Sequence, residues 1–207
     1  MKKKIAFVHN AMWEMYNFRG ELLQELKAKG YEITVICPPD EKNAHYFTDL
    51  GIKLLTVPMS RKGTNIKEDL QLVKNLFKVY KKEKFDLVFH YTIKPNIYGT
   101  LAAKLAGIKS IAITTGLGYV FLHNSITSLI AKFMYKFSLA FANEVWFLND
   151  DDMNIFLDKD LITERQAFKL PSEGINTKRF IPKEKNRKDS KTVFLMIARV
   201  LYDKGFN

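Results

Sequence analysis

Short apolar runs alternate along the chain with longer segments in which apolar residues recur every three or four positions. The short runs predict buried strands at 5–9, 31–37, 52–57, 85–90, 109–114, 144–148 and 167–170. The longer segments predict helices at 18–29, 41–50, 65–84, 95–107 and 125–143, with a short helix after Asn149. Strands that are apolar throughout and separated by helices indicate a parallel sheet covered on both faces, so the expected fold class is α/β, a doubly wound, Rossmann-like parallel sheet.

The segment 65–84 carries the clearest helical pattern. Asn65 followed by Glu68 resembles a capping box that opens the helix. The apolar positions 66, 70, 73, 77 and 80 follow the helical period and are expected to face the core. Four lysines lie away from that stripe, at 67, 74, 78 and 81. The simplest interpretation of these lysines is a solvated face, and the alternative is contact with acidic lipid.

The composition changes after the last strand of this series. Residues 176–191 are polar and strongly basic, which is typical of a linker between domains. The next residues, Thr192 to Ala198, form an apolar run that predicts a new buried strand. We therefore expect a first domain at 1–175, a linker at 176–191, and at 192–207 the first strand and loop of a second, truncated domain.

The charge of the chain favours an anionic partner. Thirty-three Lys and Arg against 22 Asp and Glu give a formal net charge of +11 and a pI of about 9.5. The excess suits nucleic acid, an acidic lipid surface or a phosphorylated substrate. Nucleic acid is the weakest of these, because basic residues are not interleaved with aromatic ones as in a recognisable nucleic-acid module. The most apolar stretch, 125–142, contains Lys132 and Lys136, so it is not expected to span a bilayer.

Other residue classes narrow the chemistry. The single cysteine, Cys37, excludes an internal disulfide and fits a reducing compartment. The four histidines show no metal-ligand spacing, and the acidic run at 150–152 follows Asn149 as a capped helix start would. Neither pattern predicts a metal site, and the resemblance described below implies that no metal is needed.

In a doubly wound fold, ligands bind beyond the carboxyl ends of the strands, and three strand ends carry unusual residues. The first loop has no G-x-G-x-x-G, which argues against a dinucleotide site. Arg19 falls in the opening turn of the predicted helix 18–29, where the helix dipole disfavours a cation, so it is a functional candidate. The alternative is a surface arginine paired with Glu21 or Glu25.

At the second strand end, Lys94 and Asn96 lie at the start of the predicted helix 95–107. A lysine beside free helix N–H groups suits a phosphate, and Asn96 could add a donor. The alternative is a solvated Lys94 with Asn96 as a cap. His90 is expected to be a hydrogen-bonded strand-end histidine and not a catalyst. At the third strand end, Gly116 and Gly118 allow the backbone to approach a ligand closely.

The residues alone lead to an α/β anion binder, and a resemblance takes the interpretation further. Residues 194–205, FLMIARVLYDKG, resemble the opening of the donor domain in the retaining GT-B glycosyltransferases of family four, where a strand ends in G/A-R and a loop ends in K-G. The family's interdomain hinge resembles Gly174-Ile175-Asn176 with Phe180 and Pro182. Its K-x-N/G-x-x-G-x-L-A-A-K segment resembles residues 94–104.

A subgroup is indicated by two further segments. Asn17-Phe18-Arg19 and Gly116-Leu117-Gly118 look most like the enzymes that extend polyprenyl-diphosphate-linked sugars, including bacillosamine-extending N-acetylgalactosaminyltransferases and enzymes of capsule and O-antigen synthesis. The resemblance implies the N-terminal half of a GT-B fold in a retaining hexosyltransferase, inactive as this piece alone. It implies a nucleotide-sugar donor, a lipid-linked saccharide acceptor and no cofactor, and a cytoplasmic protein peripheral on the inner face of the plasma membrane.

The same resemblance suggests roles for individual residues. Arg199 and Lys204 would hold the donor diphosphate, and Gly116 and Gly118 would form cleft backbone. Asn17, Arg19, Lys94 and Asn96 would bind the acceptor, at its diphosphate or its sugar. It assigns no catalytic residue. Two alternatives stay open at this point: another GT-B activity such as a sugar-nucleotide epimerase, and a non-catalytic domain that binds lipid or polyanions.

Overall fold

The computed structural model describes residues 2–60, 65–117, 121, 126–171, 174–182 and 192–198. The chain divides into two units, residues 1–173 and 174–207, and the described helices and strands all belong to the first. Its sheet has seven parallel strands in the order β3-β2-β1-β4-β5-β6-β7. The strands are β1 Lys4–Val8, β2 Glu32–Cys37, β3 Lys53–Thr56, β4 Leu87–Tyr91, β5 Lys109–Thr114, β6 Glu144–Phe147 and β7 Ala167–Lys169.

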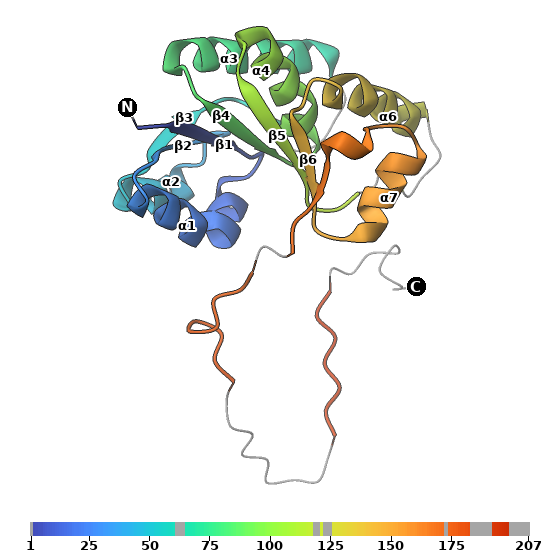
Figure 1. The fold of residues 1–207 in the computed structure, drawn as a ribbon. Helices are drawn as coiled ribbons and strands as arrows, with labels where there is room; N and C mark the ends of the chain where they lie inside the picture. The colour runs from blue at the N-terminus through green and yellow to red at the C-terminus, as the bar shows by residue number, and fades with distance from the viewer. Residues whose placement is uncertain are drawn as a thin grey trace. The chain divides into compact units, whose positions relative to one another are not determined.

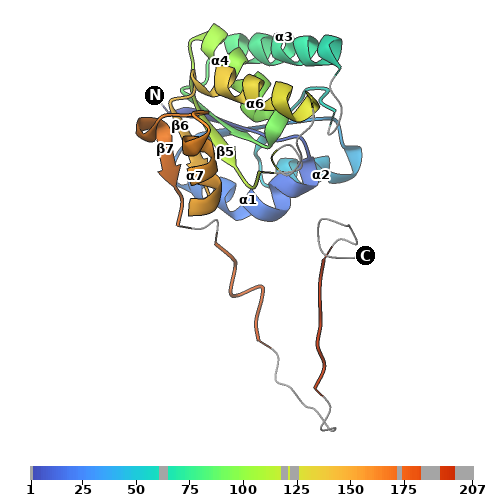
Figure 2. The ribbon, with the colours of Figure 1, turned by 90° about the vertical axis from the view of Figure 1, so that its right-hand side faces the viewer.

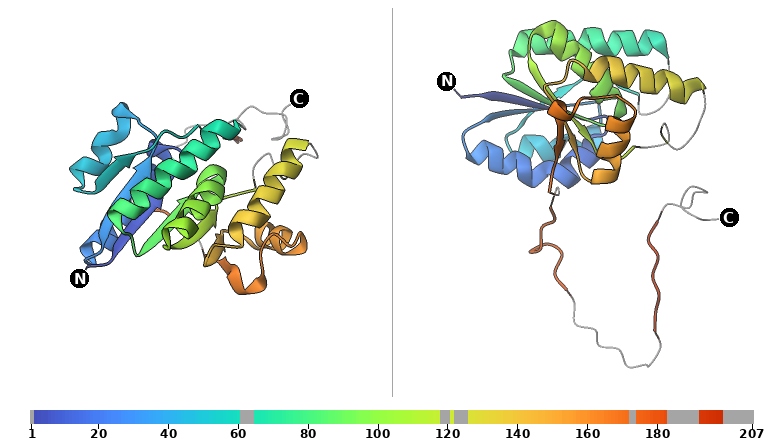
Figure 3. Two further views of the ribbon diagram at one scale, coloured as in Figure 1. Left: turned by 90° about the horizontal axis from the view of Figure 1, so that it is seen from above. Right: turned by 45° about the vertical axis from the view of Figure 1, so that its right-hand side comes forward.

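Helices cover both faces of this sheet (Figure 1). The α-helices are α1 Met12–Ala28, α2 Glu41–Asp49, α3 Ile66–Glu83, α4 Thr100–Ala106, α6 Ile126–Leu139 and α7 Asp150–Asp158. One π-helical turn, η1 at Pro95–Gly99, leads into α4, and a 3-10 turn, η2 at Glu164–Gln166, precedes β7. Helices α3, α4 and α6 lie side by side over one face, and α1 and α2 cover the other (Figures 2 and 3).

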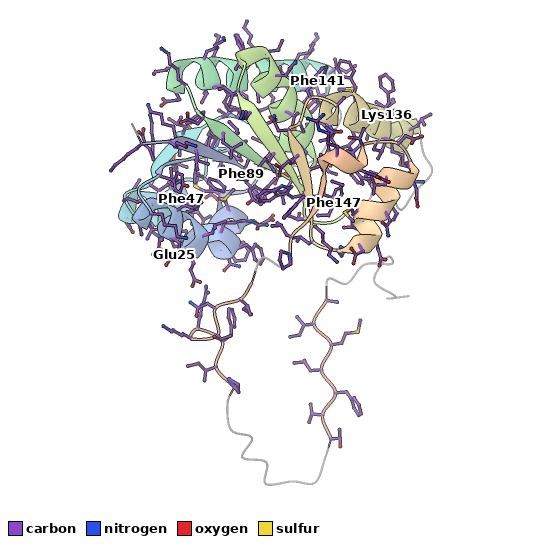
Figure 4. The ribbon with its side chains drawn as sticks, in the orientation of Figure 1. Glu25, Phe47, Phe89, Lys136, Phe141 and Phe147 are labelled. Carbon is purple, nitrogen blue, oxygen red and sulfur yellow. The ribbon has the colours of Figure 1, made fainter. Side chains whose placement is uncertain are left out.

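Apolar side chains fill the space between the sheet and each helical layer. Phe7, Met15 and Phe47 belong to the cluster under α1 and α2, and Leu76 and Tyr80 to the cluster under α3 and α4. A third cluster joins α6 and α7 to β5 and β6; its members include Tyr135, Leu139, Phe147 and Phe156. Figure 4 labels Phe47 and Phe147 in two of these layers. Burying each such side chain contributes about 1.5–3 kcal/mol, so the layers hold the strand ends in fixed positions.

The predicted fold class is confirmed. All seven predicted strands are present and parallel, and the strand predicted at 109–114 has the observed bounds. Five of its six residues are buried, as expected for an inner strand of a parallel sheet, and these include the polar Ser110 and Thr114. The strand order reverses direction between β1 and β4, so the loops after these strands border the crevice where such folds bind ligands.

One helix starts earlier than predicted. Helix α1 begins at Met12 and not at Phe18, and its N-cap, Ala11, makes no side-chain capping hydrogen bond. Arg19 therefore lies about two turns inside the helix, beyond the reach of the dipole at the N-terminus. The dipole argument for Arg19 was wrong, because the sequence carries no capping residue to mark the true start.

The predicted apolar stripe of the helix at 65–84 is also partly wrong. Ile66 and Leu70 are 75% and 66% exposed. The buried positions of α3 are instead Asp69, Leu72, Leu76 and Tyr80. The core face is rotated because it includes an acidic residue, which breaks the apolar pattern in the sequence. The four lysines at 67, 74, 78 and 81 are exposed, as predicted.

The expected helix caps are present at two helix starts. The Asn65 side chain accepts a hydrogen bond from the backbone N–H of Lys67 at 3.1 Å, and that of Asn149 from Asp152 at 2.7 Å. The capping box at Asn65 is incomplete, since the Glu68 carboxylate accepts from the Asn65 side-chain amide and not from its backbone. The acidic run at 150–152 is thus explained by capping, as expected.

In the second unit, the described residues contain turns but no strand. The Asn176 side chain accepts hydrogen bonds from the N–H groups of Lys178 and Arg179 and closes a turn. Residues 192–198 have no regular secondary structure, and Phe194 is 92% exposed, so the predicted buried strand is not found there. A strand requires a neighbouring strand for its hydrogen bonds, and the described part of this unit offers none. The domain boundaries at 175 and 191 stay a prediction.

Candidate functional site

The carboxyl edge of the sheet carries two hollows. One lies after β4 and β5 and is lined by Thr92, Ile93, Asn96, Thr114, Thr115, Gly116 and Tyr135. We call it the β4–β5 pocket; its volume is about 190 Å³. The other lies after β1 and β2, has a volume of about 380 Å³, and is lined by Asn10, Ala11, Met12, Trp13, Glu14, Pro38, Pro39, Asp40 and Met59. Both occupy the edge where doubly wound folds bind their ligands.

Three buried oxygens in the β4–β5 pocket have no hydrogen-bond partner in the described structure. They are Oγ1 of Thr92, Oδ1 of Asn96 and Oγ1 of Thr114. Asn96 is 1% exposed and Thr114 is 3% exposed. Buried polar atoms in folded proteins are almost always paired, so three unpaired oxygens on residues that line one hollow mark this hollow as a candidate ligand site.

The backbone of the same pocket is strained. Thr92 has φ = 70°, in the left-handed region that a β-branched residue rarely adopts. Such residues are costly and gather at ligand sites. Gly116 has φ = 143°, a backbone conformation that other residues avoid. A glycine is therefore needed there for the backbone conformation, in addition to letting the backbone come close to a ligand.

Asn96 is held in one orientation. Its side-chain amide nitrogen donates to the carbonyl oxygen of Ile113 at 3.1 Å. If the amide of Asn96 were flipped, its oxygen would face the Ile113 oxygen, and two acceptors cannot form a hydrogen bond. The side-chain oxygen must therefore face the other way. Asn96 and Gly116, predicted from two separate strand ends, thus meet in one pocket.

Tyr135 closes the pocket from α6. Burial raises the pKa of the Tyr135 phenol, and its neighbour Asn96 opposes part of that rise. The phenol therefore stays protonated and neutral over the physiological range. The threonines and Tyr135 were missed by sequence reasoning, because a Thr at a strand end and a Tyr in an apolar helix carry no local signal.

Lys94 does not point into either hollow. Its ammonium lies 2.7 Å from Oδ1 of Asp69 and 2.8 Å from the hydroxyl of Ser60. The hydroxyl of Tyr98 donates to the other Asp69 oxygen at 2.8 Å. Both charged side chains are about 90% buried, so the pair forms a neutral internal network. The alternative of a solvated Lys94 is therefore wrong, while a phosphate role for Lys94 stays a prediction; its partner on α3 lies too far away in the sequence to be recognised from a local pattern.

Arg19 is buried on α1, against the rings of Tyr91 and Phe18. It is 4% exposed, and its guanidinium carbon lies 4.5 Å from the centre of the Tyr91 ring and 5.6 Å from that of Phe18. The alternative of an exposed surface arginine is therefore wrong. Asn17 is half-buried on α1 and lines neither hollow.

His90 has the structural role that was expected. Its two ring nitrogens lie 2.9 Å from the Tyr80 hydroxyl and 3.4 Å from the Thr100 hydroxyl. Complete burial lowers the pKa of the imidazole to about 3, so it is neutral at pH 7. A Cβ on Gly99 would lie 2.5 Å from the His90 ring, which is why a glycine stands there.

Some of the predicted site cannot be placed. Gly118, Arg199 and Lys204 lie outside the described residues. In the ranges that the structure describes, no group of three or more His, Cys, Asp or Glu side chains could hold a metal ion. None of the described helices is long and apolar enough to cross a membrane.

Solved structures share this architecture. A glycosyltransferase from Rickettsia africae superposes with a TM-score of 0.59 at 20% identity, covering 86% of this chain and 45% of that one. A UDP-N-acetylglucosamine 2-epimerase gives a TM-score of 0.61 at 17% identity, covering 81% and 48%. At these identities the likeness shows the fold, which transferases and epimerases have in common.

Two curated proteins are related in sequence. An N,N'-diacetylbacillosaminyl-diphospho-undecaprenol alpha-1,3-N-acetylgalactosaminyltransferase of Campylobacter jejuni is 32% identical, over 98% of this chain and 57% of its own length. A UDP-Gal:alpha-D-GlcNAc-diphosphoundecaprenol alpha-1,3-galactosyltransferase of Escherichia coli is 25% identical, over 82% and 46%. The chain spans about half the length of these relatives. Residues 4–149, which include strands β1 to β6 and the lining of both hollows, match the family described as glycosyl transferase 4-like, and the chain belongs to that family.

Proposed function

We propose that this chain is the acceptor-side half of a bacterial hexosyltransferase that moves a sugar from a nucleotide-sugar donor to a saccharide on a polyprenyl diphosphate. The observation that carries the proposal is the β4–β5 pocket, whose unpaired oxygens lie at the ligand-binding edge of a glycosyl transferase 4-like domain. Both curated relatives are named as transferases with undecaprenyl-diphosphate-linked acceptors. Their names support transfer over epimerisation or passive binding, and we propose that the reaction belongs to surface polysaccharide or glycan synthesis.

The donor would bind to the part of the protein that begins at residue 192. We propose that Arg199 and Lys204 hold the donor diphosphate, since fixed cations stabilise the charge that grows on it as it leaves. In this arrangement the protein's own cations take the place of a metal, and no cofactor is required. Both relatives are named for alpha-1,3 linkages, so we propose the same linkage here, with retention if the donor is an α-linked nucleotide sugar.

The acceptor would lie along the carboxyl edge of the sheet. Asn96 and Gly116 reach it from the β4–β5 pocket, and we keep Arg19 and Asn17 as candidates near the loop after β1. Lys94 contributes by holding the start of η1 against α3 through Asp69. Its role in this proposal is positioning, because its charge is already neutralised.

A membrane face is proposed on α6. Leu129, Ile130, Phe133 and Phe137 are 69%, 56%, 67% and 51% exposed on this helix, a spacing that forms one stripe. Lys132 and Lys136 flank the stripe, and Figure 4 labels Lys136 on α6. Exposed aromatic and aliphatic side chains beside lysines suit insertion between anionic headgroups at the inner face of the plasma membrane.

Flotation with vesicles tests this face. The chain should float with phosphatidylglycerol vesicles and stay behind with phosphatidylcholine, and Phe133→Glu with Phe137→Glu should abolish flotation. Phe168→Glu is the matched control, since Phe168 is 47% exposed on β7, away from α6. Flotation that survives both α6 substitutions would remove α6 from the membrane contact.

Transfer itself is tested with the protein that contains this chain and a donor-binding domain. The protein is mixed with UDP-N-acetylgalactosamine or UDP-galactose and undecaprenyl-diphosphate-linked N-acetylglucosamine or diacetylbacillosamine. We expect an acceptor extended by one sugar, and a large loss of turnover in Arg199→Ala. Conversion of the free nucleotide sugar to its epimer, with no extension of any acceptor, would favour the epimerase alternative.

A further inference from the structure

We infer that the β4–β5 pocket binds a neutral sugar unit through hydroxyl or amide N–H groups of that sugar, and not the acceptor's diphosphate. Calling this sugar the acceptor rests on the proposed function. The choice between sugar and diphosphate rests on the atoms of the pocket alone.

Asn96 decides the polarity of the ligand. One N–H of its amide donates to the Ile113 carbonyl, and a second hydrogen bond joins the side chain to the Tyr135 phenol, so the oxygen is the side-chain atom left without a partner. An amide oxygen can only accept a hydrogen bond, so its partner must be a donor. A fully ionised diphosphate offers acceptors only and would leave this oxygen unpaired, whereas a sugar hydroxyl or an acetamido N–H would complete it.

The charges around the pocket agree with a neutral ligand. None of its described lining residues carries a charge. The nearest lysine in sequence, Lys94, is neutralised by Asp69, and the backbone N–H of Asn96 already donates to the carbonyl of Thr92 at 2.9 Å. Tyr135 is buried and protonated, so it too presents a neutral hydroxyl. The pocket thus lacks the fixed cations that a diphosphate would need.

The two threonines suit a polyol. A hydroxyl can donate or accept, so Thr92 and Thr114 can each bond a sugar hydroxyl in either direction. Together with Asn96 they place three bonding groups around a volume of about 190 Å³. That volume is below the range of complete ligand sites, and it fits one part of a larger ligand, such as a single sugar ring.

The test compares two probes on the 207-residue chain by amide NMR titration. Methyl N-acetyl-α-glucosaminide represents the sugar, and sodium pyrophosphate represents the diphosphate. We expect the sugar to shift the amides of Thr92, Asn96, Thr114 and Gly116, and pyrophosphate to leave them unmoved. Thr114→Val, which keeps the shape and removes the hydroxyl, should weaken sugar binding about tenfold, the effect of one lost hydrogen bond.

Ser138→Ala is the matched control. The Ser138 hydroxyl is also buried and unpartnered in the described structure, but it does not line the pocket. Both substitutions should leave the melting temperature equal or higher, because each removes a polar atom without a protein partner. Only Thr114→Val should weaken the sugar. A lowered melting temperature with unchanged binding would show that Thr114 is structural and would overturn the inference.

Two other results would also overturn it: pyrophosphate that shifts the pocket amides and loses affinity in Thr114→Val, or a sugar that shifts none of them. Failure here is separate from failure of the proposed function. If the sugar binds as expected but the complete protein extends no acceptor, the pocket stands and the transferase proposal fails. If acceptors are extended while the pocket ignores the sugar, only the present inference fails.

Discussion

Two groups of buried polar side chains lie at the end of β4 and just after it, and they differ in whether their atoms are paired. In the first group, His90 has a partner at each ring nitrogen and Lys94 is paired with Asp69. In the second, Thr92 and Asn96 face a hollow with unpaired oxygens, and Thr92 has a strained backbone. The first group stabilises the fold. The second lowers the stability of the fold through unpaired oxygens and a strained backbone, and a bound ligand could offset this cost by bonding to the oxygens.

The comparison teaches how to separate structural from functional polar residues on one loop. By residue type, His90 and Lys94 are the obvious candidates for chemistry and the threonines are not. When the hydrogen-bond and ion-pair partners are considered, the threonines become the candidates for ligand binding, and His90 and Lys94 become structural residues. Substitutions in the paired group should therefore lower stability, and substitutions in the unpaired group should leave stability equal or raise it.

The largest effect is expected at the buried ion pair. Asp69→Ala leaves the Lys94 ammonium buried without its carboxylate and should cost about 3–5 kcal/mol in the free energy of unfolding. Denaturant unfolding measures this. Lys169→Ala is the control, because its pair with Asp150 is about half exposed and should be worth less than about 1 kcal/mol. Equal losses in the two variants would mean that Lys94 and Asp69 are not a buried pair.

The next effect concerns the glycine against His90. A Cβ at residue 99 would meet the imidazole at 2.5 Å, so Gly99→Ala should cost about 1–3 kcal/mol through overpacking. Gly20→Ala is matched to it, since Gly20 is also a buried helical glycine but its nearest contact would be 3.3 Å. Thermal unfolding of Gly20→Ala should stay near that of the parent, because alanine favours helix. If both variants unfold at the same temperature, the contact with His90 does not determine the cost of a side chain at residue 99.

The pH dependence of stability follows from His90. Its folded-state pKa of about 3 lies below the unfolded value near 6.5, so between these values only the unfolded state binds the proton. Stability is therefore complete above about pH 6.5 and falls below it, by about 1.4 kcal/mol per pH unit from this residue. His90→Gln should flatten the fall measured between pH 6.5 and 4.5, and His45→Gln, at an exposed position, should not. An unchanged slope in His90→Gln would contradict the buried neutral imidazole.

The smallest effect is a gain. Thr92→Gly relieves the left-handed strain at φ = 70° but adds freedom to the unfolded chain, so the net stabilisation should be at most about 1 kcal/mol. The same variant should weaken sugar binding, because it removes the hydroxyl from the pocket. If calorimetry shows that Thr92→Gly is less stable than the parent, Thr92 belongs with the paired, structural residues, and the difference between the two groups does not hold.

The fold could be predicted from sequence because its signals are local. Residues 109–114 form a buried strand around the apolar residues at 111–113, and Asn149 caps α7, which begins at the next residue. Where the signal was missing the prediction failed: α1 starts at Met12 without a capping side chain, and Asp69 interrupts the apolar face of α3. The run at 192–198 has the composition of a strand, but a strand also requires a partner, which its composition cannot supply.

The site was harder to predict because its properties depend on distant contacts. Asn96 and Gly116 were found from their positions at strand ends, and they do meet in one pocket. The partner that neutralises Lys94 comes from α3, 25 residues earlier, and no local pattern reports it. The left-handed backbone of Thr92 has no sequence signature either, since that conformation usually selects glycine or asparagine.

The most direct test of this account measures steady-state transfer by the complete protein carrying Thr114→Val, with Ser138→Ala beside it. The pocket as acceptor sugar site predicts that Thr114→Val raises the KM for the polyprenyl-diphosphate-linked acceptor about tenfold and leaves the KM for the nucleotide sugar unchanged. Ser138→Ala should change neither. A raised donor KM, or an unaltered acceptor KM in Thr114→Val, would contradict the assignment of the acceptor sugar to this pocket.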